Sequence, residues 1–302
     1  GPLKPRSIPL LLQLRKIGIP LLYAVTVAPP KPSKKSWFKW SQSQRALRNL
    51  FNLLVCIVTN NEPLLDFVRH AGISTRVEII PHGVDPQRFY PADDQQQRQT
   101  IRDALGIAAS DIMITTVGGI MPRKGSHLLL EAWAQLAAEF PHVHLVLVGP
   151  RKDLEQPGLK SFRNQLNKTV STSGAPERVH FTGLCKNVEE YQRAADIFVL
   201  PSEREGMPNS VLEAMASRVA VIVTPFKGLS HDLGTPGTHF LLCDRNVTDL
   251  ASALRLLLEN PAQRSQFATQ GYQWIRENMN IERSLDRYAA LYHELAATHK
   301  TV

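Results

Sequence analysis

The residues best suited to chemistry follow an apolar run in the second half of the chain. The run ends at Leu200, and residues 201–209 then read PSEREGMPN before a segment with helical spacing. Open α/β sheets bind ligands at the carboxyl ends of such strands. Gly206 and Pro208 predict a tight turn, and Asn209 suits the N-cap of the next helix. The free N–H groups of a helix start favour a phosphate group.

Two carboxylates flank this turn. Glu205 precedes it and Glu213 lies in the first turns of the helix, so the pair can reach opposite ends of one bound ligand. A simpler interpretation is a capped helix whose acidic side chains are only solvated, and the local pattern leaves both open.

A second loop of the same kind lies earlier in the chain. Residues 117–126 read VGGIMPRKGS, so a strand again ends in a glycine-containing loop, with Ser126 expected to cap the next helix. Lys124 precedes its glycine, which excludes a Walker A loop, and no GxGxxG pattern is present. Its ammonium group can contact a diphosphate, an interaction that contributes about 1.5–3 kcal/mol. Taken alone, Arg123 and Lys124 are interpreted as ordinary loop charges.

Short apolar runs alternate with amphipathic segments along the chain, which predicts parallel sheets covered by helices on both faces. Asn61 and Pro63 open one of these helices, and Gly72 ends it. The expected strands are 21–27, 55–59, 77–80, 112–117, 144–148, 179–182, 196–200, 219–224 and 240–243, and further helices are expected over 8–17, 47–54, 248–259, 261–278 and 281–298.

The polar segment 81–98 carries turn residues and is expected to link two domains. Residues 1–98 then form a first domain with this linker, and residues 99–278 form a second. The first series supplies about three strands, where an open doubly wound domain needs about five or six. Either the first domain is abbreviated or its beginning is missing from this chain, and we expect the second.

Composition excludes several classes of protein. The chain has 302 residues, of which 43% are apolar and 21% charged, which is typical of a globular protein and not of a disordered or collagenous one. The longest uncharged run, 17–30, is too short for a membrane span and holds three prolines. Cys56, Cys185 and Cys243 lie far apart, so we expect buried thiols, no metal site and a cytoplasmic location.

The positive charge is concentrated at the start of the chain. Residues 1–61 hold ten Lys or Arg and no acidic residue, whereas the remaining 25 basic and 27 acidic residues nearly balance. Residues 34–40 read KKSWFKW, a mixture of bases and aromatics that suits an anionic lipid surface. The alternative is a solvated face. Nucleic acid is disfavoured as a partner because no binding motif of that class accompanies the charge.

Together these segments resemble glycosyltransferase family 4. The resemblance covers roughly residues 55–298, and the order and spacing of its motifs are specific. It rests on Gly118, Lys124 and Gly125, on Pro201 and Ser202, on Glu205 and Glu213 with seven residues between them, on the pattern IPHGVD at residues 80–85 with Phe89 and Pro91, and on residues 224–237.

The resemblance implies a retaining enzyme with the α/β GT-B fold of two Rossmann-like domains. It would transfer a sugar from a nucleoside diphosphate donor to a sugar, polysaccharide or lipid-linked acceptor, without a cofactor. The last segment, 279–302, would pack back toward the first domain. The absence of a DxD pair agrees with the metal independence of this fold.

The resemblance also implies roles for particular residues. Glu213 would accept hydrogen bonds from the ribose, and Glu205 would hold hydroxyl groups of the donor sugar. Lys124 would stabilise the charge of the departing diphosphate, so Lys124 and Glu205 are the implied catalytic residues. Gly183 and Leu184 would lie near the base. The implied donor-binding set is Gly118, Gly119, Arg123, Lys124, Gly183, Leu184, Glu205, Gly206, Met207, Pro208, Asn209, Ser210, Val211, Leu212 and Glu213.

Two positions depart from the family pattern. Many members carry Arg at the position of Gly119 and His at about that of Thr26. His82 is expected to structure the loop between the domains. Two other enzyme classes stay open, a nucleotide-sugar epimerase and a phosphorylase of the same fold, as does a non-catalytic nucleotide-binding or membrane-docked module.

Overall fold

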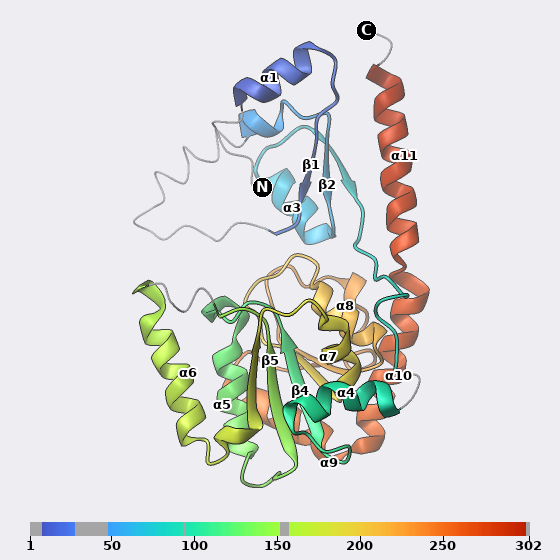
Figure 1. Ribbon diagram of the computed structural model, residues 1–302. Coiled ribbons are helices and arrows are strands. Elements are labelled where there is room, and N and C mark those ends of the chain that lie inside the picture. The colour runs from blue at the N-terminus through green and yellow to red at the C-terminus, as the bar shows by residue number, and fades with distance from the viewer. Residues whose placement is uncertain (1–7, 28–47, 93–94, 152–156, 300–302) are drawn as a thin grey trace.

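Two parallel sheets, one above the other, organise the chain (Figure 1). The computed structural model describes residues 8–27, 48–92, 95–151 and 157–299. Within these residues one sheet has three strands in the order β1-β2-β3, and the other has six in the order β6-β5-β4-β7-β8-β9. The strands are β1 (Leu22–Val25), β2 (Cys56–Thr59), β3 (Arg76–Ile79), β4 (Ile112–Val117), β5 (Val143–Val148), β6 (Val179–Gly183), β7 (Ile197–Leu200), β8 (Ala220–Val223) and β9 (Leu241–Leu242).

Helices connect and cover these strands. The α-helices are α1 (Ile8–Lys16), α3 (Glu62–His70), α4 (Gln95–Leu105), α5 (Ser126–Leu136), α6 (Lys160–Thr172), α7 (Val188–Ala194), α8 (Asn209–Ala216), α9 (Val247–Glu259), α10 (Pro261–Asn278) and α11 (Ile281–His299). Short 3-10 turns lie at η3 (Pro122–Lys124), η5 (Pro157–Leu159), η6 (Pro176–Arg178) and η7 (His231–Leu233). In the part of the chain that the structure describes, no helix is both long enough and apolar enough to cross a bilayer.

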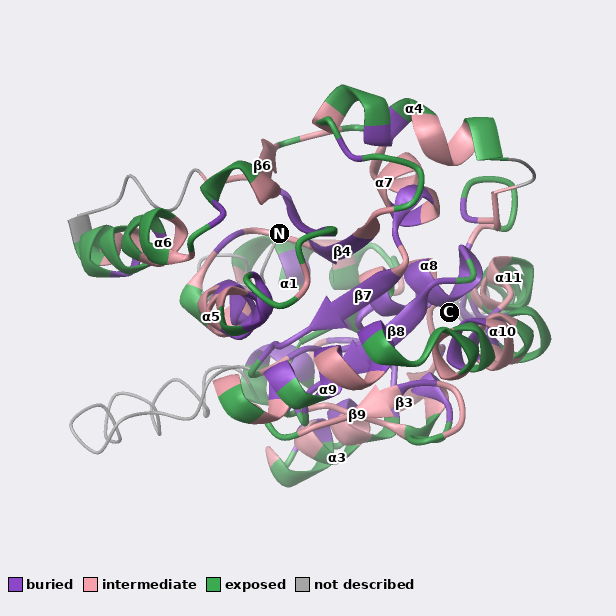
Figure 2. Cartoon of the chain, turned by 90° about the horizontal axis from the view of Figure 1, so that it is seen from below, coloured by how far each residue is buried: buried purple, intermediate pink, exposed green. Residues whose placement is uncertain are grey.

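The larger sheet is buried on both faces, as expected for parallel strands between helices. Along β7, Ile197 and Val199 face a core shared with α5, α6 and α9, while Phe198 and Leu200 face α8 and α10. Figure 2 shows the central strands β7 and β8 buried and the outer helices carrying the exposed residues. The order of this sheet reverses between β4 and β7, which defines a topological switch point where their carboxyl ends diverge.

The smaller sheet is covered on its second face by the end of the chain. Tyr288, Leu291 and Leu295 of α11 pack against Cys56 and Val58 of β2. Polar contacts add to this packing: the Ser284 hydroxyl donates to Pro81 O at 2.7 Å, Arg287 donates to Ile79 O at 2.5 Å, and Arg76 pairs with Glu294. Figure 1 shows α11 running alongside this sheet after α10 has crossed the larger one.

The strands lie within one or two residues of the predicted positions, but three predictions need correction. The segment 95–98, predicted as linker, forms the start of α4, because Ile101 and Arg102 bury this polar helix against the larger sheet. The predicted helix over 47–54 is helical only at 48–51 among described residues. Of the three cysteines only Cys56 is buried, whereas the other two are half-buried.

Candidate functional site

The two loops predicted to bind a ligand meet at the switch point. Gly125, which follows β4, adopts φ +72°, and a Cβ there would lie 2.0 Å from Pro201 O after β7. The Glu203 N–H donates to Arg123 O at 2.9 Å. The loops are therefore joined backbone to backbone, an approach that only glycine permits at position 125.

Glu205 and Lys124 form an ion pair where these loops meet. Lys124 Nζ lies 2.7 Å from Glu205 Oε1, the Ser202 hydroxyl donates to the same oxygen at 2.5 Å, and Arg123 approaches it to 3.4 Å. Only 9% of the Glu205 side chain is exposed, so its negative charge is balanced by fixed partners. Among described residues no hydrogen bond reaches Oε2, which leaves that oxygen able to accept from a ligand.

The lysine side chain is positioned by a second glycine. Gly118 adopts φ +141°, and a Cβ built there would lie 3.4 Å from Lys124 Cε. The lysine side chain therefore extends across Gly118, which has no side chain, and reaches Glu205. Gly119 lies beneath Met121, whose Cε would be 3.1 Å from a Cβ at 119. The guanidinium group of Arg123 approaches Glu205 Oε1 to 3.4 Å.

The start of α8 forms the third wall of the site, but Asn209 is not its cap. The N-cap is Pro208, and Asn209 Oδ1 instead lies 2.7 Å from His82 Nδ1. The N–H groups of Asn209, Val211 and Leu212 donate to the carbonyls of Met207 and Pro208. Within the described chain Ser210 N–H has no such acceptor, so it is the donor in this turn left for a phosphate oxygen.

The cap of α5 was also predicted wrongly. Gly125 is the N-cap, and Ser126 is the first residue of the helix with no capping hydrogen bond from its side chain. The reason is the left-handed turn at Gly125, which places the helix start one residue earlier than the sequence pattern indicates.

Glu213, on α8, is surrounded by a different set of charges. Burial raises the pKa of Glu213, an effect that the nearby Arg88 opposes and that Glu189 reinforces. Arg88 and Glu189 themselves pair at 2.8 Å. The structure thus brings Lys124, Arg123 and Glu205 together, and places Glu213 toward α7 and the linker. Gly183, with φ +71°, is the last residue of β6, and the 73% exposed Leu184 follows it at the same edge of the sheet.

The smaller sheet reaches the site through residues that the sequence analysis did not assign to it. A Cβ at Gly206 would lie 1.6 Å from Thr26 O, and Asn61 Nδ2 donates to Gly206 O at 3.2 Å and Gly228 O at 3.3 Å. We call this contact between residues 26, 60–61, 206 and 228 the domain junction. The helix-capping pattern predicted only the local role of Asn61.

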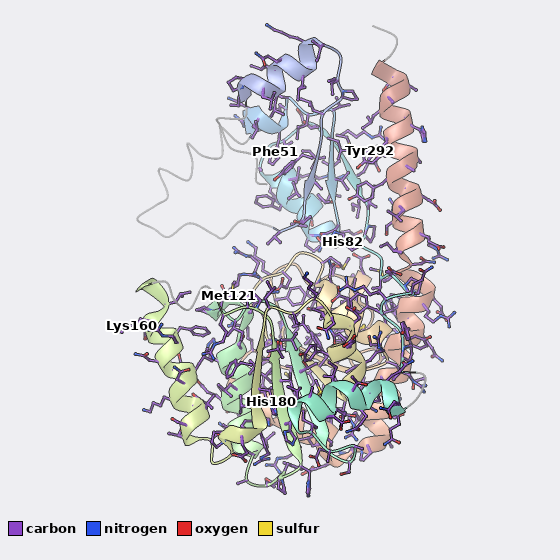
Figure 3. The ribbon with its side chains drawn as sticks, viewed as in Figure 1. Phe51, His82, Met121, Lys160, His180 and Tyr292 are labelled. Atoms are coloured by element: carbon purple, nitrogen blue, oxygen red, sulfur yellow. The ribbon has the colours of Figure 1, made fainter. Side chains whose placement is uncertain are left out.

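His82 lies between the two sheets, as Figure 3 shows, with Met121 at the facing end of the larger sheet. His82 Nδ1 contacts Asn209 Oδ1, and His82 Nε2 lies 3.4 Å from Asn60 Nδ2. The histidine thus links the end of β2 to the start of α8, in the loop-structuring position expected for it.

The two parallel sheets, with the Lys124–Glu205 pair at the switch point of the larger one, have the arrangement of the GT-B fold, which consists of two Rossmann-like domains. The family described as Glycosyl transferases group 1 matches residues 97–274. The chain belongs to this family.

Individual relatives agree with this assignment. The chain is 26% identical over 219 residues to the lipopolysaccharide core biosynthesis mannosyltransferase LpsB of Rhizobium meliloti, covering 72% of this chain and 60% of that protein. It is 30% identical over 234 residues to the D-inositol 3-phosphate glycosyltransferase of Geodermatophilus obscurus, covering 74% of this chain and 49% of that one. The chain thus spans about half to three fifths of these relatives.

Solved structures show the same fold. Anabaena Alr3699/HepE in complex with UDP superposes with a TM-score of 0.81 at 19% identity, covering 96% of this chain and 77% of that one. The C-terminal domain of the group 1 glycosyl transferase LpcC from Francisella tularensis gives a TM-score of 0.58 at 29% identity, covering 66% of this chain and 100% of that one.

Proposed function

We propose that this chain transfers a glycosyl group from a nucleoside diphosphate sugar to a hydroxyl group of a sugar, polysaccharide or lipid-linked acceptor, with retention of anomeric configuration. The observation that carries the proposal is the Lys124–Glu205 pair at the switch point, beside the start of α8. The UDP and UDP-glucose complexes of the similar Anabaena protein support a nucleotide-sugar donor.

The geometry suggests a division of roles. Lys124 and the Ser210 N–H would contact the diphosphate, and Glu205 Oε2 would accept from donor-sugar hydroxyls. The bond between the anomeric carbon and the phosphate oxygen breaks, the acceptor oxygen bonds that carbon, and the acceptor proton passes to the released diphosphate. Positive groups already in place at the leaving oxygens would lower the barrier most, because they need no rearrangement as charge develops.

A transfer assay tests this proposal. UDP-, GDP- and ADP-sugars would be supplied with simple sugar acceptors, and the product anomer would be assigned by NMR. We expect a glycoside with the donor's configuration. Release of an isomerised sugar without acceptor would point to the epimerase instead, and a requirement for inorganic phosphate would point to the phosphorylase.

We also propose a cytoplasmic location with peripheral contact to anionic membranes. Apolar side chains on and after α1 are exposed, Ile17 by 71% and Leu10 by 59%, next to Arg15 and Lys16. The surrounding segment 1–61 carries only positive charges, which complements anionic lipid. The basic and aromatic residues 34–40 lie outside the described residues.

Vesicle sedimentation tests this contact. We expect binding to phosphatidylserine vesicles that weakens in high salt, and weak binding to phosphatidylcholine alone. Binding that ignores lipid charge would contradict the proposal.

A further inference from the structure

Asn61 makes three hydrogen bonds from a fully buried side chain. Its Oδ1 accepts from Leu64 N–H at 3.0 Å, which caps α3. Its Nδ2 donates across the domain junction to Gly206 O and Gly228 O. A carboxamide has both an acceptor and two donors, whereas aspartate and serine could supply the cap but not both cross-domain bonds.

The two carbonyls that Asn61 holds belong to glycines next to Glu205. Gly206 is the next residue in the chain, and Gly228 packs directly against Glu205, because a Cβ at 228 would lie 2.2 Å from Glu205 O. The Glu205 N–H also donates to Lys227 O at 3.2 Å. Asn61 therefore fixes the backbone that carries the carboxylate, without touching the carboxylate itself.

The junction is polar and incompletely satisfied. Thr59 Oγ1 and Asn60 Oδ1 are buried, and no described residue gives them a hydrogen-bond partner. Leaving such groups unpaired opposes burial, so this contact adds little net stability for its area. Its steric fit is nevertheless close, since Gly206 meets Thr26 O with no room for a side chain. Such an interface suits the placement of a loop better than the stabilisation of a fold.

We propose that Asn61 is a positioning residue for sugar transfer: its Nδ2 holds the Glu205–Gly206 loop against the first domain, so that Glu205 meets the donor sugar in a fixed place. This rests on the proposed function of Glu205. Nucleotide binding, which involves Lys124 and α8 of the second domain, does not need Asn61.

Cap-preserving variants separate this role from helix capping. Asn61→Ser and Asn61→Asp both keep an N-cap for α3. Serine is too short to reach the two carbonyls, and aspartate places an oxygen against them. Asn246→Ser is the matched control, because Asn246 caps α9 in the same way, accepting from Asp249 N–H at 2.9 Å away from the junction.

We expect kcat for transfer to fall about 5- to 50-fold in Asn61→Ser, the loss expected for two hydrogen bonds, and further in Asn61→Asp. The affinity for UDP, GDP or ADP should stay close to wild type, the Tm should fall modestly because two buried carbonyls lose their donor, and Asn246→Ser should keep wild-type kcat. An unchanged kcat in Asn61→Ser overturns the proposal. So does a loss of kcat matched by equal losses of nucleotide affinity and Tm, which would show a merely structural role.

Hydrogen exchange gives a readout that does not depend on activity. The amides of Glu205 and Lys227 are hydrogen-bonded in the loop that Asn61 holds. In Asn61→Ser these amides should exchange faster, whereas those of α3 should not. If the wild-type chain transfers no sugar, the proposed function fails, but faster exchange still supports the clamp. Unchanged exchange at both amides overturns the clamp whatever the activity.

Discussion

Glu205 and Glu213 are separated by only seven residues, yet their surroundings are opposite. One carboxylate oxygen of Glu205 contacts Lys124, Arg123 and Ser202, so its position is fixed by side chains of the protein. Glu213 is desolvated, which raises its pKa, and Arg88, whose charge opposes this rise, forms an ion pair with Glu189. The contrast suggests that one carboxylate is fixed before the donor arrives, whereas the other is completed by hydrogen bonds that a ligand brings.

The largest expected effect concerns Lys124, the ion-pair partner of Glu205. Lys124→Ala should lower kcat for transfer about 10²- to 10³-fold, because the proposed role of this lysine is to stabilise the charge of the leaving diphosphate. Steady-state kinetics with the donor identified by the transfer assay measures this loss. The exposed Lys160 on α6 provides the control. A loss of kcat no greater in Lys124→Ala than in Lys160→Ala would show that Lys124 has no part in the mechanism.

Isosteric amides at the two carboxylates should affect nucleotide binding differently. Glu213→Gln should weaken binding of the plain nucleotide about 10- to 100-fold, since it weakens hydrogen bonds from ribose to a charged acceptor. Glu205→Gln should leave that affinity the same or tighter, because it frees Lys124 for the diphosphate. Isothermal titration calorimetry measures the nucleotide affinity of both variants. Equal losses would show that the two carboxylates do not differ in role.

The raised pKa of Glu213 predicts a pH dependence of nucleotide affinity. Only the ionised carboxylate accepts two ribose hydroxyls, so affinity should be constant above the pKa of Glu213 and fall by up to about tenfold per pH unit below it. Binding titrations of the wild type and of Glu213→Gln from acid to neutral pH measure this dependence. The variant corrects for protonation of the nucleotide itself. An identical pH profile in the two proteins would contradict this role.

The smallest effects should appear in stability, with opposite signs. A carboxylate whose folded-state pKa is raised destabilises the folded protein at neutral pH, and stability increases as pH falls through that pKa. Glu213→Gln should therefore raise the Tm slightly. Glu205→Gln should lower it, because charge-assisted hydrogen bonds worth about 1.5–3 kcal/mol are weakened. Thermal unfolding without nucleotide measures the Tm of both variants. A shift of both Tm values in the same direction would contradict the proposed difference between Glu205 and Glu213.

Local patterns predicted the strands and the two loops that meet at the switch point, because a short, continuously apolar run such as Ile197–Leu200, buried at every position, marks a central strand of a parallel sheet. They misplaced both helix caps, since a left-handed turn at Gly125 and the proline at 208 moved the helix starts. They could not reveal the second role of Asn61, whose partners are 145 and 167 residues away in the chain. Contacts between domains leave no periodic signal in a single sequence.

The central claim is that the switch-point edge of the larger sheet holds the diphosphate of a nucleotide-sugar donor. Its most direct test compares, by calorimetry, the affinity for a nucleoside diphosphate with that for the matching nucleoside, in the wild type and in Lys124→Ala. The account predicts that the diphosphate binds at least about tenfold more tightly to the wild type, and that most of this advantage is lost without the lysine. An advantage of the same size in both proteins, or no binding of UDP, GDP or ADP to the wild type, would contradict it.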